Sequence, residues 1–472
     1  MTFDSINFWI VFPFIFGFYW LIPAKKSTIR KVFLIAVSYL LYMAWNPAWA
    51  LALFSISILT YLGGILVGTL GLLKKQRTWA WILTLLSLTP LLFFKYYTFL
   101  NHYIQKGLSF AGFSFSMPGL NYAVPVGISF FTFQAVGYLL DVYHKKTVVE
   151  KNILDYLLFV SFFPQISAGP ISSPQQLLPQ IKSNHTFDYE MAKQGLMYVL
   201  WGLFMKVVIA DRLGIIVDYV FATYPTFSGG ACLLTCLFFS LQIYCDFAGY
   251  SLMAIGIART IGFKLPDNFK RPYLAFSLTD FWHRWHITLT QWFTRQVYIP
   301  LGGNRRGKGR TYLNIFITFL LSGIWHGANL TFIVWGAIHG VLLVVEKACG
   351  LHKIERNGFG IKLLRTIATF IVVSFTWIFF RAPGLPTAAK FIAHIFSFSP
   401  GLAIHAIDTT TLFIAILGAV LLLIKDFKDE FFYGRLSFFK CRAFQWAFYI
   451  VLLCMIVNMG VLDGGQFIYM GF

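Results

Sequence analysis

Charged residues are scarce in this chain. Asp, Glu, Lys and Arg make up 12% of its 472 residues, whereas hydrophobic residues make up 58% and the mean hydropathy is +0.70. A water-soluble domain of this length does not carry so apolar a composition, which therefore predicts an integral membrane protein. The apolar runs are long enough to cross a hydrocarbon layer about 30 Å thick as helices, and they are too long for barrel strands.

Acidic residues are the scarcer charge, with 18 Asp and Glu against 38 Lys and Arg, a formal charge of +20. Such an excess also occurs in nucleic-acid-binding proteins. Here, however, the basic residues fall in short clusters between apolar runs, as the positive-inside rule describes. We therefore predict no nucleic-acid partner, contact with membrane lipid, and a cytoplasmic position for the clusters. They lie near residues 25–31, 74–77, 145–151, 264–271, 305–310, 353–365 and 425–442.

Cytoplasmic basic clusters define a path through the membrane with both termini outside. The first apolar run, 8–22, follows Asp4 and precedes the basic cluster, which is the reverse of a signal peptide, so we expect a retained helix. Residues 153–168 are expected to be re-entrant, because a crossing there would break the alternation of sides. The other expected helices lie near 32–45, 49–73, 79–94, 122–142, 195–223, 231–257, 311–325, 330–347, 366–381, 411–424 and 443–461, about twelve in all. The fold class is thus an all-α polytopic membrane protein, with 1–472 as one membrane-embedded domain.

Cysteine is also sparse. The six cysteines form no CxxC pair, and Cys232 and Cys236, although one helical turn apart, have no histidine cluster beside them. We expect small apolar packing residues rather than a structural disulfide or a metal site.

The usual nucleophile and nucleotide motifs are missing. There is no GxSxG elbow and no cysteine beside a histidine. Residues 302–308 match the first seven positions of a GxxxxGK[ST] loop, but Gly309 stands where the Mg²⁺-binding Ser or Thr belongs and no strand precedes it. Both departures argue against an ATPase. The basic turn remains a candidate for binding anions, either lipid headgroups or the phosphates of a soluble donor.

What the sequence does contain is a histidine between two apolar stretches, His326. An ionisable group at membrane depth is costly unless it faces a polar cavity or a partner, so we interpret His326 as functional, with a satisfied core histidine as the alternative. Because no serine or cysteine nucleophile is evident, the simplest chemistry for this imidazole is to act as a base on a hydroxyl. Its ordinary pKa near 6.5 leaves it mostly neutral at pH 7.

Upstream of His326 lies the most basic segment, 262–310. Within it, Phe281, Trp285, Leu289 and Trp292 recur at helical spacing, which predicts one amphipathic helix lying in the membrane interface. His286 does not fit that pattern well. It is expected either to belong to the interfacial helix or to face a polar interior.

Several ordered motifs resemble the membrane-bound O-acyltransferase family. They are DFWHRWH at 280–286, YIPLGGNR at 298–305, WHGA at 325–328 and WGAIHG at 335–340, with further matches at 125–134, 162–170, 244–251 and 377–383. The likeness covers roughly 120–385, and within the family it is greatest to the membrane subunit of bacterial alginate and related polysaccharide O-acetylation. His283 departs from the pattern, since arginine is more frequent at that position.

The resemblance implies a ring of about 11–12 transmembrane helices around a tunnel, in the bacterial cytoplasmic (inner) membrane. A cytoplasmic acyl thioester, such as acetyl-CoA, would donate an acyl group to a hydroxyl of a cell-surface polysaccharide or of a periplasmic esterase-like partner. No cofactor is implied beyond that donor. His326 matches the catalytic histidine of the family, and His286 matches its second recurring polar position.

Further site residues are expected to contact substrate, and for some of them a structural role stays open. The candidates are Asp280, Arg284, Trp285, Trp325 and Asn329. The alternative for Asn329 is a polar residue at a helix N-terminus. Asp246, within an apolar run, is interpreted as pairing with an intramembrane cation rather than as a catalytic group.

Two other functions remain compatible with the sequence. A transporter would also hold intramembrane histidines, but no inverted halves or matching broken helices are evident. Within the acyltransferases, D-alanyl transfer to teichoic acid is the alternative, although the motifs at 298–305 and 325–328 favour acetylation.

Overall fold

A computed structural model describes residues 2–70, 73–113, 123–353, 358–397, 399–432, 442–462 and 468. In these ranges every regular element is helical, and one isolated β-bridge joins Phe227 and Leu402. The N-terminal helices are α1 (Ile6–Leu21), α2 (Ser27–Met43), α3 (Pro47–Thr69), α4 (Leu73–Phe110), α5 (Ile128–Tyr143), α6 (Ile153–Ser161), α7 (Phe163–Ile166) and α8 (Pro174–Lys182). They are followed by α9 (Tyr189–Leu203), a π-helical segment (Phe204–Ala210), α10 (Asp211–Thr223), α11 (Gly229–Thr260), α12 (Leu278–Arg284), α13 (Ile287–Phe293), α14 (Lys308–His326), α15 (Leu330–Ala348), α16 (Phe359–Arg381), α17 (Leu385–Phe396), α18 (Thr409–Phe431) and α19 (Arg442–Met459).

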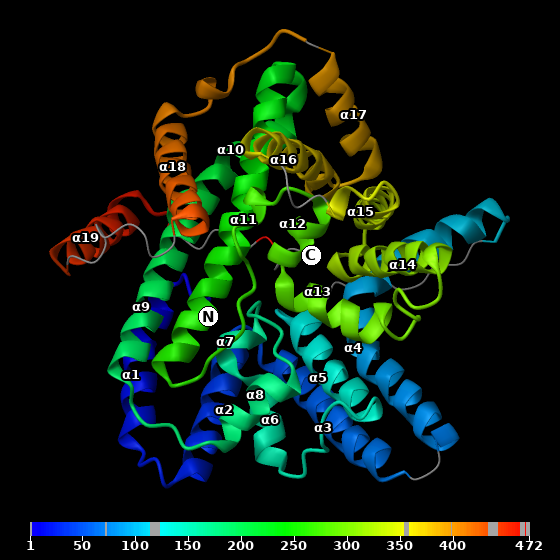
Figure 1. Ribbon diagram of the computed structural model, residues 1–472, viewed down its shortest axis with the longest axis vertical. Coiled ribbons are helices and arrows are strands. Elements are labelled where there is room, and N and C mark those ends of the chain that lie inside the picture. Colours follow the sequence, from blue (N-terminus) through cyan, green and yellow to red (C-terminus); the bar gives the residue numbers. More distant parts are fainter. Residues whose placement is uncertain are drawn as a thin grey trace.

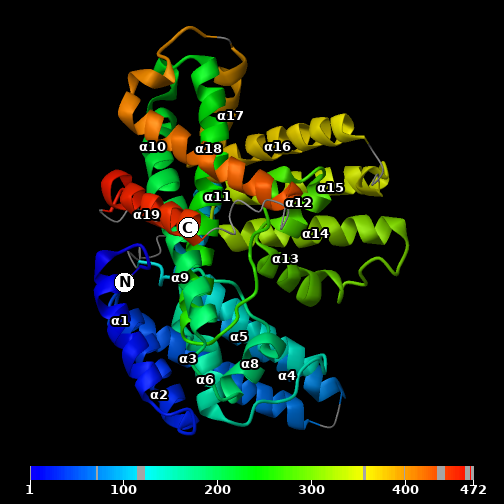
Figure 2. The ribbon, with the colours of Figure 1, turned by 60° about the vertical axis from the view of Figure 1, so that its left-hand side comes forward.

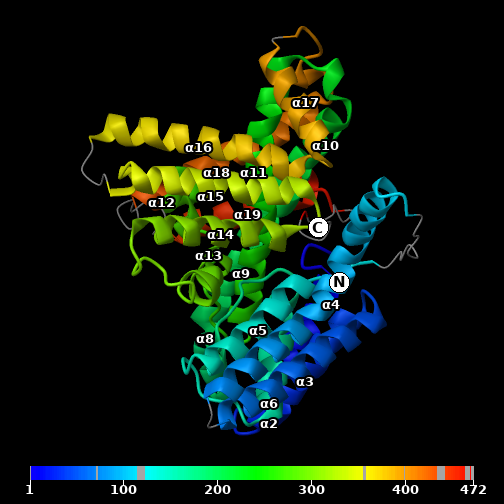
Figure 3. The same ribbon diagram turned by 90° about the vertical axis from the view of Figure 1, so that its right-hand side faces the viewer.

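These helices divide into two parts that share α11 (Figure 1). Helices α1 to α8 gather at one end of the long axis, and α10, α17 and α18 gather at the other (Figure 2). Helices α14, α15 and α16 run side by side across the molecule, with α15 packed against both neighbours (Figure 3). The buried apolar side chains form two clusters, one centred on α1 to α8 and the other on α9 to α18, and α11 contributes to both.

The all-α polytopic fold expected from composition is confirmed. Six of the described helices are long and apolar enough to cross a membrane, namely α3, α4, α11, α15, α16 and α18. Helices α1, α5, α17 and α19 are apolar but shorter. The segment expected to be re-entrant forms α6 and α7, which contain nine and four residues and are too short to cross. The number of crossings and the sides of the termini stay predictions, and Met1 and Phe472 lie outside the described residues.

Two expectations about local structure were wrong. The helix expected near 79–94 does not end there, because α4 continues past Pro90 and through Lys95 to Phe110. After Pro90 the run contains no further proline and one glycine, so its polar residues do not prevent a helix. The single interfacial helix expected around 281–293 is instead two short helices, because His286 adopts a left-handed backbone conformation (φ 43°). Helices α8 and α17 were not anticipated.

Candidate active site

His326 is the last residue of α14 and lines a small cavity at the boundary of the two apolar clusters. Its side chain is buried, with 3% of its surface exposed. The other walls of the cavity come from α4, from the chain entering α5 and from the residue before the histidine. They are Lys95, Val124, Pro125, Val126, Gly127, Ile128, Ser129, Phe130 and Trp325. The His326 imidazole therefore faces a cavity instead of lipid.

A close crossing of α14 and α15 fixes the direction in which His326 approaches this cavity. Gly323 and Gly336 face each other at the crossing, and a Cβ added at either residue would lie about 3.0 Å from the Cα of the other. Larger side chains would push the helices apart. The glycine at 327 ends α14 in an extended conformation, and a Cβ there would collide with the Phe332 ring.

Aromatic side chains surround the His326 imidazole. The rings of Trp325, Trp335 and Phe380 lie 4.9, 5.1 and 5.1 Å from it, all close to perpendicular. Trp335 in turn stacks on Trp377 at 5.6 Å. This packing restricts rotation of the imidazole, which suits a side chain that must meet a substrate in one orientation.

His286 lies deep in the protein, on the far side of Trp325. Its ring is 5.9 Å from the ring of Trp325, and its side chain is 1% exposed. The Nδ1 atom of His286 is 3.1 Å from Oδ1 of Asn268, and that same oxygen accepts hydrogen bonds from the amide and hydroxyl of Thr288. Since Oδ1 is an acceptor, Nδ1 of His286 carries the proton and Nε2 is left as an acceptor.

This burial corrects the interfacial interpretation of His286. Burial lowers the pKa of His286 to about 3, so the imidazole is neutral at physiological pH. Phe281, Trp285, Leu289 and Trp292 are likewise buried in the protein and do not form a lipid-facing stripe. His283, in contrast, is exposed.

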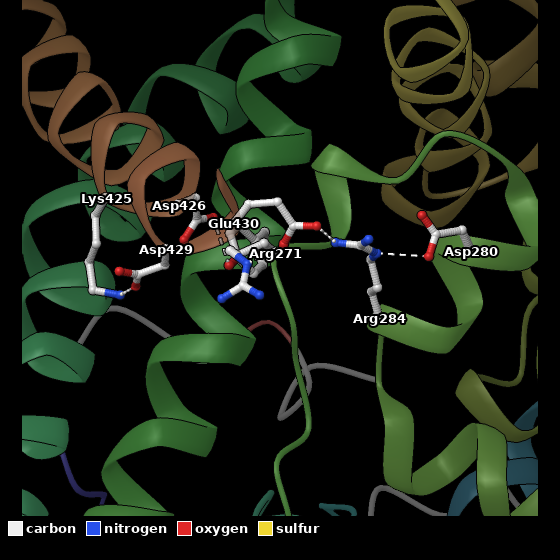
Figure 4. Close-up of polar contacts among 8 residues, drawn as sticks. Arg271, Asp280, Arg284, Lys425, Asp426, Asp429 and Glu430 are labelled. Atoms are coloured by element: carbon white, nitrogen blue, oxygen red, sulfur yellow. Dashed lines mark hydrogen bonds and ion pairs between the residues drawn. The ribbon is translucent and has the colours of Figure 1, made fainter. Parts of the chain in front are cut away.

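Asp280 and Arg284 belong to an ion-pair network that joins α12 to the end of α18 (Figure 4). The Arg284 guanidinium donates to Asp280 at 2.8 Å and to Glu430 at 2.9 Å. Glu430 also accepts from Arg271 at 2.6 Å. Neither Asp280 nor Arg284 lines the His326 cavity. Their expected contact with substrate stays a prediction, and any anion bound there would compete with Glu430.

The remaining expected site residues have different surroundings. Trp325 lines the cavity and packs on Phe130 and Phe133, with ring centroids 5.5 Å away in both cases. Trp285 is 1% exposed and packs on Trp377 at 5.0 Å, away from the cavity. Asn329 caps the start of α15 by accepting from the Thr331 amide, and its amide group donates to the Pro383 carbonyl. The helix-capping alternative for Asn329 thus has direct structural support.

Asp246 does pair with a buried cation, as expected. Lys206, on the π-helical segment, lies 2.8 Å from Asp246 and 2.6 Å from Asp211. Exposure of the three side chains is 0%, 2% and 8%. The second oxygen of Asp246 accepts from the Ile468 amide at 2.8 Å. We call this cluster closed because Lys206 pairs with two carboxylates inside the protein.

Sequence reasoning missed Lys95, Ser129 and Asn268. The signal for Lys95 was present, since a lysine that follows an uninterrupted apolar run is costly in a membrane helix. It was overlooked because the helix was expected to end at residue 94. Asn268 carried no such signal: it lies in an irregular segment, and only the folded chain brings it to His286.

The geometry brings together a histidine, a lysine and a cavity, side chains of the kinds that can accept a proton and stabilise negative charge. Among the described residues, no three His, Cys, Asp or Glu side chains gather as they would around a metal ion. The arrangement does not depend on a nucleophilic serine or cysteine.

Comparison with known proteins agrees with this chemistry. The profile of the membrane-bound O-acyltransferase family matches residues 79–380. The chain is 36% identical over 401 residues to the probable alginate O-acetylase of Pseudomonas syringae, covering 84% of this chain and 76% of that protein. It is 35% identical to the peptidoglycan O-acetyltransferase of Helicobacter pylori, with coverage of 78% and 74%. The teichoic acid D-alanyltransferase of Bacillus subtilis is 27% identical, with coverage of 62% and 75%.

The matched region contains α14, α15 and the His326 cavity, and the relatives named are acyl-transferring enzymes. A transporter is therefore excluded. This multi-pass membrane protein belongs to the membrane-bound O-acyltransferase family and is an O-acyltransferase.

Proposed function

We propose that the chain transfers an acetyl group from a cytoplasmic thioester, acetyl-CoA, to a hydroxyl of a cell-surface polysaccharide or of a periplasmic esterase-like partner. The single observation that carries the proposal is His326, a buried base lining a cavity at the end of α14. The relatives with the higher identities are named for O-acetylation, which favours acetyl over D-alanyl transfer. On this proposal residues 1–472 act as one membrane-embedded acyltransferase domain in the bacterial inner membrane.

The length of α14 supports the proposed direction of transfer. Its 19 residues begin beside the exposed basic turn at 305–310 and rise about 28 Å, close to the thickness of the hydrocarbon layer. With the basic turn on the cytoplasmic side, His326 lies toward the outer side. The thioester then approaches from the cytoplasm and the hydroxyl from outside, and only the acyl group crosses.

The chemical step needs one base. The imidazole of His326 takes the proton from the acceptor hydroxyl as its oxygen attacks the thioester carbonyl carbon. The new C–O bond forms, and the carbonyl π pair moves to oxygen, giving a tetrahedral oxyanion. When this intermediate collapses, the C–S bond breaks and the leaving thiolate takes the proton from the imidazolium. An ester and a thiol are the products.

The test is the surface-ester content of a strain that lacks the chromosomal gene and expresses either the wild type or His326→Ala at equal membrane level. We expect the surface-ester content of the alanine variant to be at least 100-fold lower than that of wild type, because removal of a general base lowers the rate by about 10² to 10⁴. More than a tenth of wild-type ester would contradict the role of His326 as the base.

A vesicle assay tests the direction. Acetyl-CoA added to sealed inside-out vesicles should be cleaved by the wild type, and right-side-out vesicles should leave it intact. Cleavage only in right-side-out vesicles would reverse the proposed direction. Release of D-alanine rather than acetate from the cell-surface ester would favour the alternative function.

A further inference from the structure

Lys95 is the lysine of the His326 cavity, and no role follows for it from the base chemistry. It lies in the middle of α4, which is apolar enough to cross a membrane, and its side chain lines the same cavity as His326. The ion pairs among the described residues join other lysines and arginines, and none joins Lys95 to a carboxylate. A lysine at this depth without a fixed counter-charge is a candidate partner for negative charge that develops in the cavity.

The contacts of Lys95 hold its ammonium group at the edge of the site. Its Nζ donates to the Trp325 carbonyl at 2.8 Å and lies 3.4 Å from the Ser129 hydroxyl. An ammonium group has three donors, so one N–H is left for the cavity. The two fixed contacts limit its movement, which is the requirement for a preorganised donor.

The neighbouring Tyr96 provides an internal comparison. Its hydroxyl donates to the Ile324 carbonyl, so Lys95 and Tyr96 meet carbonyls of consecutive residues in the last turn of α14. Carbonyls in the last turn of a helix have no hydrogen-bond partner within that helix, and Lys95 and Tyr96 supply one to each of these two. Tyr96, however, does not line the cavity. The two residues share the capping role, and only Lys95 faces the reaction.

A second feature makes the same wall of the cavity electropositive. The 16-residue helix α5 begins at Ile128, and its first turn, including Ser129, lines the cavity. A helix N-terminus carries a partial positive charge. The backbone there is fixed, since Gly127 adopts a left-handed conformation (φ 73°) and an added Cβ would collide with the Ile166 carbonyl.

From these contacts we propose that Lys95 is a catalytic residue whose ammonium group stabilises the oxyanion of the tetrahedral intermediate. This assignment rests on the proposed function, because the oxyanion arises when the hydroxyl activated by His326 attacks the thioester. Lys95 keeps its proton throughout and donates a hydrogen bond to the oxygen that receives the carbonyl π pair. This hydrogen bond no longer stabilises a negative charge once the thiolate leaves and the carbonyl of the ester re-forms.

The test compares Lys95→Met with Tyr96→Phe in inside-out vesicles supplied with acetyl-CoA, with thiol release as the readout. Lys106→Met is the matched control, since Lys106 is an exposed lysine on the same helix. We expect Lys95→Met to lower kcat about 100-fold with less than a threefold change in KM, as for removal of one oxyanion donor. Lys95→Arg should recover part of that loss, and both Tyr96→Phe and Lys106→Met should stay within about threefold of wild type.

Three results would overturn the assignment. The first is turnover of Lys95→Met within threefold of wild type. The second is a Tyr96→Phe variant as inactive as Lys95→Met, which would leave capping of α14 as the whole role of Lys95. An increase in KM with unchanged kcat would make Lys95 a binding group for an anionic substrate. The His326→Ala variant distinguishes failure of this assignment from failure of the proposed function. If only the assignment of Lys95 fails, His326→Ala is still inactive. If the proposed function fails, His326→Ala is active.

Discussion

The His326 cavity and the Lys206 cluster both place ionisable side chains inside apolar helices, but they differ in how their partners are arranged. Lys206 is 0% exposed and lies within 2.8 Å of two carboxylates, so its charge is paired inside the protein. His326 and Lys95 instead line a cavity, and Lys95 has only neutral oxygens within hydrogen-bonding distance among its recorded contacts. From this difference we propose that an ionisable side chain is structural where it is paired with opposite charge inside the protein and functional where it opens onto a cavity.

The largest effect on stability is expected at the Lys206 cluster. Lys206→Met leaves Asp211 and Asp246 buried without their cation, and removal of one partner from a buried ion pair costs about 3 to 5 kcal/mol. Thermal unfolding in detergent measures the loss. The control is Lys193→Met, because Lys193 is 38% exposed, its pair with Glu190 lies at the surface, and less than about 1 kcal/mol is expected. Equal losses for the two variants would remove the distinction between a closed buried cluster and a surface pair.

A smaller effect, on rate rather than stability, is expected at Asn268. Its side chain binds Thr288 and holds Nδ1 of His286, so Asn268→Ala should leave His286 free to change its tautomer and orientation. We expect turnover of acetyl-CoA to fall about tenfold, since small misplacements of catalytic groups cost up to about 10². Asn458→Ala, at an exposed asparagine in α19, is the control.

The pattern of the Asn268 effect distinguishes two roles for His286. If His286 lies on the donor entrance, more acetyl-CoA restores the rate, and if it acts in the chemistry, the lower rate persists at saturation. Wild-type kinetics for Asn268→Ala at every donor concentration would leave His286 as a packing residue.

The smallest effect is expected at the network of Figure 4. Glu430 accepts from Arg271 and Arg284, whose side chains are 31% and 18% exposed, so water screens these pairs. Glu430→Gln should lower the free energy of unfolding by about 1 kcal/mol or less, similar to Asp429→Asn, which breaks the pair with Lys425. A loss as large as that of Lys206→Met would show that exposure does not separate the two kinds of cluster.

The sequence predicted the features that depend on local pattern. Composition and apolar length gave the all-α membrane class, and the ordered motifs gave the family and His326. The pairing of Asp246 with an intramembrane cation was also anticipated, although its partner Lys206 was not named. These features follow from hydropathy and from the cost of burying charge, both of which can be evaluated along the chain.

Other features depend on contacts between distant segments. Asn268 and Thr288 stabilise the break in the helix at His286, and helical periodicity alone gives no sign of that break. Glu430 reaches Arg284 from 146 positions away, and Lys95 reaches Trp325 from 230. Substrate binding remains a prediction for four residues, Asp280, Arg284, Trp285 and Asn329. Their recorded contacts are with other parts of the protein, and none of them lines the cavity.

Thiol release from acetyl-CoA per folded molecule, measured on His326→Ala and Lys206→Met together, tests the central comparison most directly. We predict that His326→Ala keeps a melting temperature near that of wild type and loses at least 100-fold in turnover. Lys206→Met should unfold at a lower temperature, while its folded fraction turns over within about threefold of wild type. The opposite outcome, an active His326→Ala or a folded but inactive Lys206→Met, would contradict the claim that the cavity carries the chemistry and the closed cluster carries the fold.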